Sequence, residues 1–179
     1  NTKLYLLIES ASARKVGLYE CAEFPQKWKR LEPILQDVEL YDPTIYFHEG
    51  YWYLFGTQRP VPGSSTDMYL YIYYSTDLLH TNWQPHPRNP VTRDVRGSRP
   101  AGRIFTFRGK LVRPSQVGTP KYGYSIRFYE IIKLSPAEFE QTPLNDMLPW
   151  TPDMLATHTY SASGGYYVTD AQVRRFRFF

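Results

Sequence analysis

The chain has a single cysteine, Cys21, among its 179 residues, which excludes an internal disulfide framework and a zinc site built from cysteines. It contains no apolar run long enough to span a membrane and no signal-peptide pattern, so we expect a cytoplasmic protein. A glycine-rich phosphate-binding loop and a Ser–His–Asp signature are also lacking. Its four histidines are scattered, and we expect neither a metal site nor a cofactor.

Helical periodicity is equally scarce. Only Ser135–Gln141 and Thr151–Leu155 look like possible helical turns, and in each a Ser or Thr is followed directly by proline, a plausible helix start. Aromatic residues are abundant instead, with 16 Tyr, 10 Phe and 4 Trp making up 17% of the chain, and 15 Pro and 11 Gly punctuate it. This composition favours many short strands separated by turns, and therefore an all-β fold.

Three segments of the chain repeat one plan, in which a short strand leads through a glycine turn into a second apolar strand. The glycines of these turns lie 59 and 56 residues apart, and an aromatic marker recurs at spacings of 55 and 56. The turn glycines are Gly50, Gly109 and Gly165, and the markers are Trp28, Trp83 and Phe139. A repeat of this length made of short strands is typical of β-propeller blades.

We therefore predict a single, partial β-propeller domain over residues 1–179, with about three and a half blades of four antiparallel strands. The blades are expected near residues 1–38, 39–93, 94–148 and 149–179. The first unit begins at its second strand, Leu4–Ile8, and the alternation in Arg175–Phe179 indicates a further strand. The open blade edges are expected to be covered by missing blades or by a second copy of the chain.

In a propeller, the side chains at the start of each inner strand converge on the central channel. The residues predicted to lie there are Asp42, Arg99, Arg103, Arg113, Gln116, Tyr122, Tyr124, His158 and Asp170. Polar groups beside aromatic rings suit a sugar, and arginines suit a carboxylate or phosphate on that sugar. Other interpretations stay open: Asp42 could cap a turn, and His158 could be an interior histidine. Arg99 and Arg113 could form structural ion pairs with Asp42, Asp94 or Asp170, whereas His48, His80 and His86 fit surface positions.

The net charge is +4, and the arginines are concentrated in the second half of the chain. They indicate either an anionic partner or simply a solvated basic surface.

Several strings resemble known propellers. Asp42-Pro43-Thr44 with the strand Tyr51–Phe55 resembles the blade opening of five-bladed propeller glycosidases of the arabinanase and β-xylosidase type. Arg99-Pro100-Ala101-Gly102-Arg103, Arg113-Pro114 with Gln116, and Thr157-His158-Thr159 resemble more closely the N-terminal propeller domain of glucosamine inositolphosphorylceramide transferase-like proteins. The resemblance implies a part of a five-bladed propeller that binds a glycan or glycoconjugate.

The resemblance to glycosidases is incomplete at the position of their catalytic acid. These enzymes use a Glu at the start of a later inner strand, whereas Ser98–Ile104 contains no carboxylate. We therefore expect a glycosidase-like, carbohydrate-binding propeller, for a glycan that can carry an anionic group, whose capacity for hydrolysis is doubtful. The alternatives are an active glycoside hydrolase, with Asp42 and Asp170 as catalytic residues, and a protein- or nucleic-acid-binding propeller. Nucleic acid is the less favoured partner because no known motif for it is present.

Overall fold

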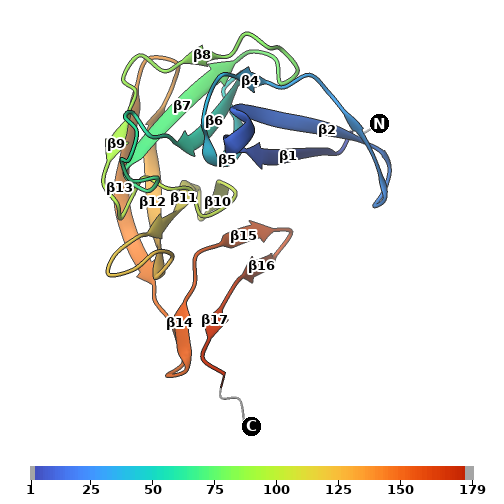
Figure 1. Ribbon diagram of the computed structural model, residues 1–179. Helices are drawn as coiled ribbons and strands as arrows, with labels where there is room; N and C mark the ends of the chain where they lie inside the picture. Colours follow the sequence, from blue (N-terminus) through green and yellow to red (C-terminus); the bar gives the residue numbers. More distant parts are fainter. Residues whose placement is uncertain (1–2, 176–179) are drawn as a thin grey trace.

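The computed structural model describes residues 3–175 as a series of antiparallel β-sheets that follow one another along an arc (Figure 1). The helical content of this part of the chain is one 3₁₀ turn, η1 (Ala11–Ala13). Within residues 3–175, no helix is both long and apolar enough to cross a bilayer. The predicted all-β propeller built from four-stranded antiparallel sheets is confirmed.

The first two sheets each place long strands beside short outer ones. In the first sheet, β1 pairs with β2, and β2 also pairs with the short strands β3 and β4. Their bounds are β1 (Tyr5–Ser10), β2 (Lys15–Glu23), β3 (Lys27–Arg30) and β4 (Leu35–Gln36). The second sheet runs in the order β5-β6-β7-β8, and β9 also pairs with β7. Its strands are β5 (Tyr41–His48), β6 (Tyr51–Thr57), β7 (Tyr69–Ser75), β8 (Gln84–Pro85) and β9 (Thr92–Arg93).

The third sheet has the regular order β10-β11-β12-β13, and the chain then forms a long, interrupted hairpin. The sheet consists of β10 (Phe105–Phe107), β11 (Lys110–Val117), β12 (Ser125–Leu134) and β13 (Phe139–Met147). The hairpin consists of β14 (Met154–Ala156), β15 (Tyr160–Ser163), β16 (Tyr166–Thr169) and β17 (Gln172–Val173), in which β15 pairs with β16 and β14 with β17. The prediction of a further strand over Arg175–Phe179 concerns residues that lie, except for Arg175, outside the described part of the chain.

The three inner hairpins turn as their sequences predict. Both central residues of each turn have positive φ, at 46° and 84° for Glu49-Gly50, 49° and 77° for Arg108-Gly109, and 59° and 82° for Gly164-Gly165. Two-residue turns of this kind follow the right-handed twist of the flanking strands, and glycine adopts them at little steric cost. The repeated glycine signal therefore locates the inner hairpin of each unit.

The core is divided among the interfaces between successive sheets, and β6 contributes to two of them. Leu54 packs with Val16 and Leu18 of the first sheet, whereas Tyr53 and Phe55 pack with residues of the third. The buried partners on the third-sheet side include Ile104, Ile131, Leu134 and Phe139. A strand covered on both faces must be apolar on both faces, which explains the nearly continuous apolar runs in this chain.

The last hairpin docks on the third sheet through a close backbone approach. The amide of Tyr160 donates to the carbonyl of Ala101 at 2.7 Å, and the ring of Tyr160 packs against Phe105 and Phe128. Gly102 has a φ of 138°, and a Cβ atom at this position would collide with the backbone carbonyl of Tyr160. Only glycine lets these two chain segments approach each other so closely.

Two predicted outer strands are interrupted. In place of one strand over Gln84–Val91, the structure has β8 and β9, because Pro85, Pro87 and Pro90 cannot donate to a ladder. The side chain of Asn89 fills the gap by bonding both the amide and the carbonyl of Ile72, at 2.9 and 2.7 Å. The strand predicted over Lys29–Leu35 is likewise divided between β3 and β4.

The two predicted helical turns do not form. The Ser135 hydroxyl accepts the amides of Ala137 and Glu138, but the chain then enters β13 and pairs with β12. Met154 and Leu155 similarly belong to β14. At both places the backbone groups are satisfied by pairing with a neighbouring strand, β13 with β12 and β14 with β17, which outweighs the local capping signal.

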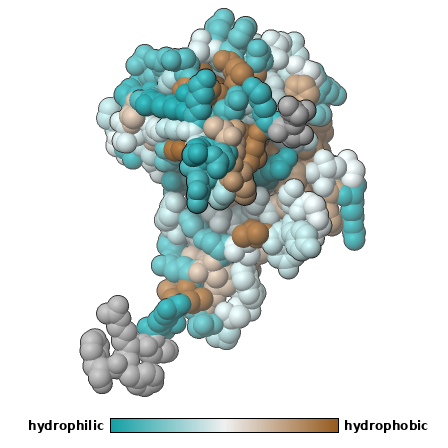
Figure 2. All heavy atoms as spheres, turned by 90° about the vertical axis from the view of Figure 1, so that its right-hand side faces the viewer, coloured by the Kyte–Doolittle hydropathy of each residue, from teal (hydrophilic) through white to brown (hydrophobic). Residues whose placement is uncertain are grey.

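The side of the molecule that carries the first sheet exposes apolar atoms among polar ones (Figure 2). On and next to β1, Leu4, Leu6 and Ile8 are exposed, while Tyr5 and Leu7 pack against the core. This alternation is typical of a strand whose sheet packs against the core on one face and is exposed on the other. Coverage of the open edges by further blades or by a second copy stays a prediction.

We predict that Gly102→Ala destabilises the protein more than Gly109→Ala. Both glycines have positive φ, but a Cβ at Gly109 would meet open space, whereas one at Gly102 would meet backbone. We expect losses of unfolding free energy of about 1 kcal/mol for Gly109→Ala and about 2 kcal/mol or more for Gly102→Ala. Urea denaturation of the two variants measures both values. Equal losses would contradict the close approach of the last hairpin to the third sheet.

Candidate functional site

A cavity of about 260 Å³ lies between the second sheet, the third sheet and the last hairpin. Its walls include Asp42–Thr44 at the start of β5, Pro100–Gly102 ahead of β10, and Thr159–Ser161 at β15. Gln116 of β11 and Val168 of β16 complete them. The starts of three successive inner strands therefore meet at one cavity.

Asp42 owes its position in this cavity to an irregularity in β5. The pairing of β5 with β6 shifts register between Tyr41 and Thr44, next to Pro43, which has no amide hydrogen. Asp42 adopts a φ of 48°, and its amide donates to Oε2 of Glu9 at 2.6 Å. A positive φ is costly for a residue other than glycine, and such residues cluster at functional sites.

The carboxylate of Asp42 joins the second sheet to the third. Its Oδ2 accepts hydrogen bonds from Nε of Arg99 at 2.5 Å and from Nε2 of Gln116 at 2.9 Å. Gln116 is 3% exposed, and its Nε2 also donates to the carbonyl of Pro100 at 2.8 Å. Among residues 3–175, the buried Oε1 of Gln116 has no hydrogen-bond partner, so the amide keeps an acceptor unused.

Arg99 is held by two carboxylates and two rings. Its Nη1 donates to Asp67 at 2.7 Å and to Thr66 at 2.9 Å, while its Nε bonds Asp42. The guanidinium carbon lies 5.0 Å from the ring centroid of Tyr122 and 5.8 Å from that of Tyr41. Burial, the largest single influence, lowers the pKa of Arg99, but the hydrogen bonds that its guanidinium donates to Asp42 and Asp67 outweigh burial and raise that pKa above its usual range.

His158 and Asp170 lie where the last hairpin is interrupted, beside a cavity of about 310 Å³ that Tyr122 also lines. Asp170 Oδ1 accepts the amides of His158 and Thr159 at 2.9 and 2.7 Å, and its Oδ2 contacts Nδ1 of His158. The rings of His158 and Tyr122 lie edge to face at 5.8 Å. The Asp170 carboxylate thus replaces the missing ladder bonds and orients the imidazole.

The electrostatic surroundings of Asp170 keep it ionised. Burial is the largest influence and raises the pKa of this carboxyl, but the backbone amides of His158 and Thr159 and the charge of His158 outweigh it. The pKa therefore lies below its usual value. An ionised carboxylate only accepts hydrogen bonds, so Nδ1 of His158 carries the proton between them.

The three predicted substrate-binding arginines have different surroundings. For Arg99, the sequence left open substrate binding or a structural ion pair with Asp42, and the structure contains this ion pair. Arg113 is 1% exposed, and its guanidinium bonds Gln141 and the backbone carbonyls of Gly97 and Ser98. The expectation that Arg113 lines the channel is therefore wrong: it is buried inside the third blade, where desolvation lowers its pKa to about 10 while Tyr129 raises it in part.

Arg103 is exposed and lines a neighbouring cleft. Tyr124 joins the third sheet to the last hairpin through its backbone, since its amide donates to Val117 and its carbonyl accepts from Thr157.

The expectation of a surface position for His86 is also wrong, because this side chain is 2% exposed. It follows the short strand β8, and its Nδ1 accepts the amide of Arg88 at 3.2 Å. Burial is the largest cause that lowers the pKa of His86.

Three residues of the site carry no signal in the sequence: Glu9, Thr66 and Asp67. Glu9 is near the end of β1, and Thr66 and Asp67 belong to the loop between β6 and β7 that reaches back to Arg99. Their contacts join residues 32 to 33 positions apart, at sites where the chain shows no motif.

We predict that Asp170→Asn destabilises the protein in a pH-dependent way. Because the folded-state pKa of Asp170 is depressed, its contribution to stability is present above the unfolded-state pKa, near 3.8, and is lost as the pH falls through the folded-state value. The loss of unfolding free energy in Asp170→Asn should therefore be larger at about pH 6 than at about pH 3. Urea denaturation at both pH values measures it, with the exposed Asp153→Asn as control. A loss equal at both pH values would contradict this role.

Comparison with known proteins identifies relatives of this chain. Residues 1–150 match the family described as glucosamine inositolphosphorylceramide transferase 1, N-terminal. Glucosamine inositolphosphorylceramide transferase 1 of Arabidopsis thaliana is 36% identical over 143 residues, which cover 79% of this chain and 18% of that protein. The protein of the same name from Oryza sativa subsp. japonica is 33% identical over 145 residues, covering 80% and 19%. The chain thus spans less than a fifth of these relatives.

Solved structures share the fold at low identity. The Bacteroides ovatus protein "Xyloglucan PUL GH43B" superimposes with a TM-score of 0.55 at 15% identity, over 94% of this chain and 33% of that one. An exo-β-1,3-galactanase from Clostridium thermocellum gives a TM-score of 0.53 at 16% identity, over 78% and 31%. Both are five-bladed propeller glycosidases, and the likeness shows the fold alone. The chain belongs to the family of N-terminal domains of glucosamine inositolphosphorylceramide transferase 1.

Proposed function

We propose that this domain binds a carbohydrate in the cavity between its inner strands, as a recognition module without a full set of hydrolytic groups. The observation that carries the proposal is the meeting of Asp42 and Gln116 at one cavity formed by three successive units. Both residues are held by neighbours before any ligand arrives. Glu9 accepts the backbone amide of Asp42 and Arg99 donates to its carboxylate, while the side-chain amide of Gln116 donates to the carbonyl of Pro100. Prepositioned polar groups reduce the entropic cost of binding.

The chemistry of these groups suits hydroxyls. Asp42 is an acceptor, and Gln116 holds a buried Oε1 that lacks a partner among residues 3–175. A buried acceptor without a partner costs about 1–3 kcal/mol, which a donor from a ligand would recover. Sugars present hydroxyl donors on a ring whose C–H face packs against aromatic side chains, and Tyr160 lies in the wall of the same cavity.

Binding is favoured over hydrolysis because the carboxylates of the site are engaged as acceptors. Glycosidases generally need one protonated carboxylic acid and one carboxylate. Asp170 has a lowered pKa, and Oδ2 of Asp42 already accepts two hydrogen bonds. Glu130 is bonded to Lys110 at 2.6 Å on the third sheet and does not line the cavity. These contacts leave no group of the described site suited to protonate a leaving group.

The names of the curated relatives suggest where such a module would act. They are called transferases of glucosamine inositolphosphorylceramide, and this chain matches less than a fifth of their length. The propeller would then hold the glycan part of a glycoconjugate, while group transfer would take place in another part of a longer protein. The likeness to glycosidase folds fits this division, because a sugar-binding cavity can be kept without the hydrolytic acid.

The proposal predicts that Asp42→Asn weakens carbohydrate binding by about tenfold or more, the usual effect of losing a charged hydrogen-bond partner. Chemical-shift perturbation with a panel of mono- and oligosaccharides measures binding to the wild type and the variant. The exposed Asp153→Asn is the matched control and should bind like the wild type.

Two results would contradict the proposal. One is a panel in which no sugar binds the wild type, and the other is Asp42→Asn binding with unchanged affinity. Release of reducing sugar by the wild type, abolished in Asp42→Asn, would instead establish a glycoside hydrolase.

A further inference from the structure

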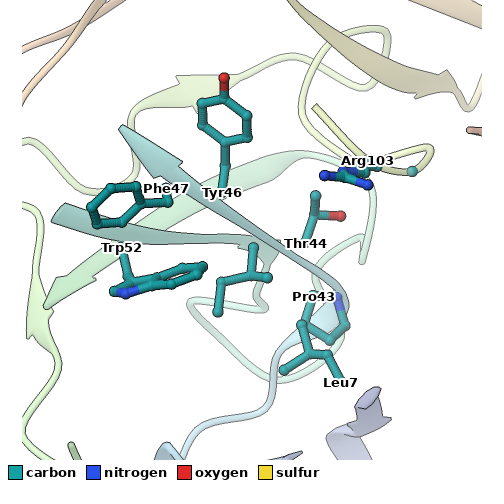
Figure 3. Close-up of a pocket in the computed structure, with 9 residues that line it drawn as sticks. Leu7, Pro43, Thr44, Tyr46, Phe47, Trp52 and Arg103 are labelled. Carbon is teal, nitrogen blue, oxygen red and sulfur yellow. The ribbon is translucent and has the colours of Figure 1, made fainter. Parts of the chain in front are cut away.

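A second cleft, of about 510 Å³, adjoins the cavity of Asp42 and Gln116. Pro43, Thr44 and Gly102 line both, so the two spaces share walls along the first half of β5. The cleft continues along β5 toward Phe47 and Trp52 (Figure 3). A ligand larger than one sugar ring can therefore extend from one space into the other.

The far end of this cleft is aromatic. The rings of Phe47 and Trp52 lie 5.0 Å apart at an interplanar angle of 52°, and Phe47 is 50% exposed. Leu7 and Ile45 supply further apolar wall. An exposed aromatic surface at the end of a cleft offers a face on which the C–H side of a sugar ring packs.

Arg103 is the one charged residue among those that line the cleft within residues 3–175. Figure 3 shows its guanidinium on the side of Thr44, away from Trp52. In the described part of the chain, Arg103 has no hydrogen bond or ion pair of its side chain, whereas Arg99 is held by Asp42 and Asp67 and Arg113 is buried. Of the three arginines, Arg103 alone therefore presents an available cation to a ligand.

We propose that this cleft is a subsite for a sugar unit that carries an oxyanion, with Arg103 pairing the anion and Phe47 and Trp52 packing against the ring. The inference rests on the carbohydrate binding proposed above and adds the class of sugar. An arginine fork bonds a carboxylate or a phosphate through two parallel N–H groups, and both sources share this chemistry. Asp42 and Gln116 would hold the neutral hydroxyls of the adjoining unit.

Matched monosaccharides that differ only at C6 provide the test. The probes are glucose, galactose and mannose, each compared with its uronic acid and its 6-phosphate, and affinities come from chemical-shift titrations of the chain. The variants are Arg103→Gln and, as matched control, Arg108→Gln, since Arg108 is also exposed on an inner hairpin and stacks on Phe107 at 5.2 Å. The uronic acids and the phosphates, titrated separately, distinguish the two sources of the anion.

We expect at least one acidic probe to bind more tightly than its neutral counterpart. Arg103→Gln should weaken the acidic probe about tenfold and leave the neutral one unchanged, while Arg108→Gln changes neither. If neutral sugars bind but Arg103→Gln changes neutral and acidic affinities equally or not at all, the subsite is overturned while carbohydrate binding stands. If no sugar binds the wild type, both proposals are overturned together.

Discussion

The hydrogen-bonded ion pair between Arg99 and Asp42 connects the blades at the candidate site. Arg99 lies ahead of the third sheet, and its partners Asp42 and Asp67 belong to the second. Burying a guanidinium is costly unless its donors are paired, and here two carboxylates and a hydroxyl supply that pairing. Because Gln116 bonds the same oxygen of Asp42, the position of the cavity wall depends on this contact.

The ion pair can form only because the sheets pack face to face. Leu54 contacts the first sheet while Tyr53 and Phe55 contact the third, so the second sheet is held from both sides. That packing brings the starts of the inner strands together, and the bulge at Pro43 then turns Asp42 into the cavity. The polar site thus depends on an apolar framework built from alternating positions of single strands.

Local signals in the sequence were reliable where a short segment determines its own structure. The glycine turns formed where predicted because positive φ at two successive positions is a local requirement. The outer strands and the two helical turns were less predictable, since prolines and cross-strand pairing decide them. The side chain of Asn89 forms the hydrogen bonds to Ile72 that a neighbouring strand would otherwise form. No pattern in the sequence predicts that a side chain replaces backbone groups in this way.

The sequence alone determined the all-β class, the inner hairpins and the residue types available at the channel, because strand and turn propensities act over a few residues. Only the tertiary structure decided what each of three similar arginines does. Arg99 pairs across blades, Arg113 is buried within one, and Arg103 faces a cleft. A guanidinium has the same chemistry at all three positions, and what differs is the set of distant groups, such as Asp67 and Gln141, that folding brings within hydrogen-bond distance.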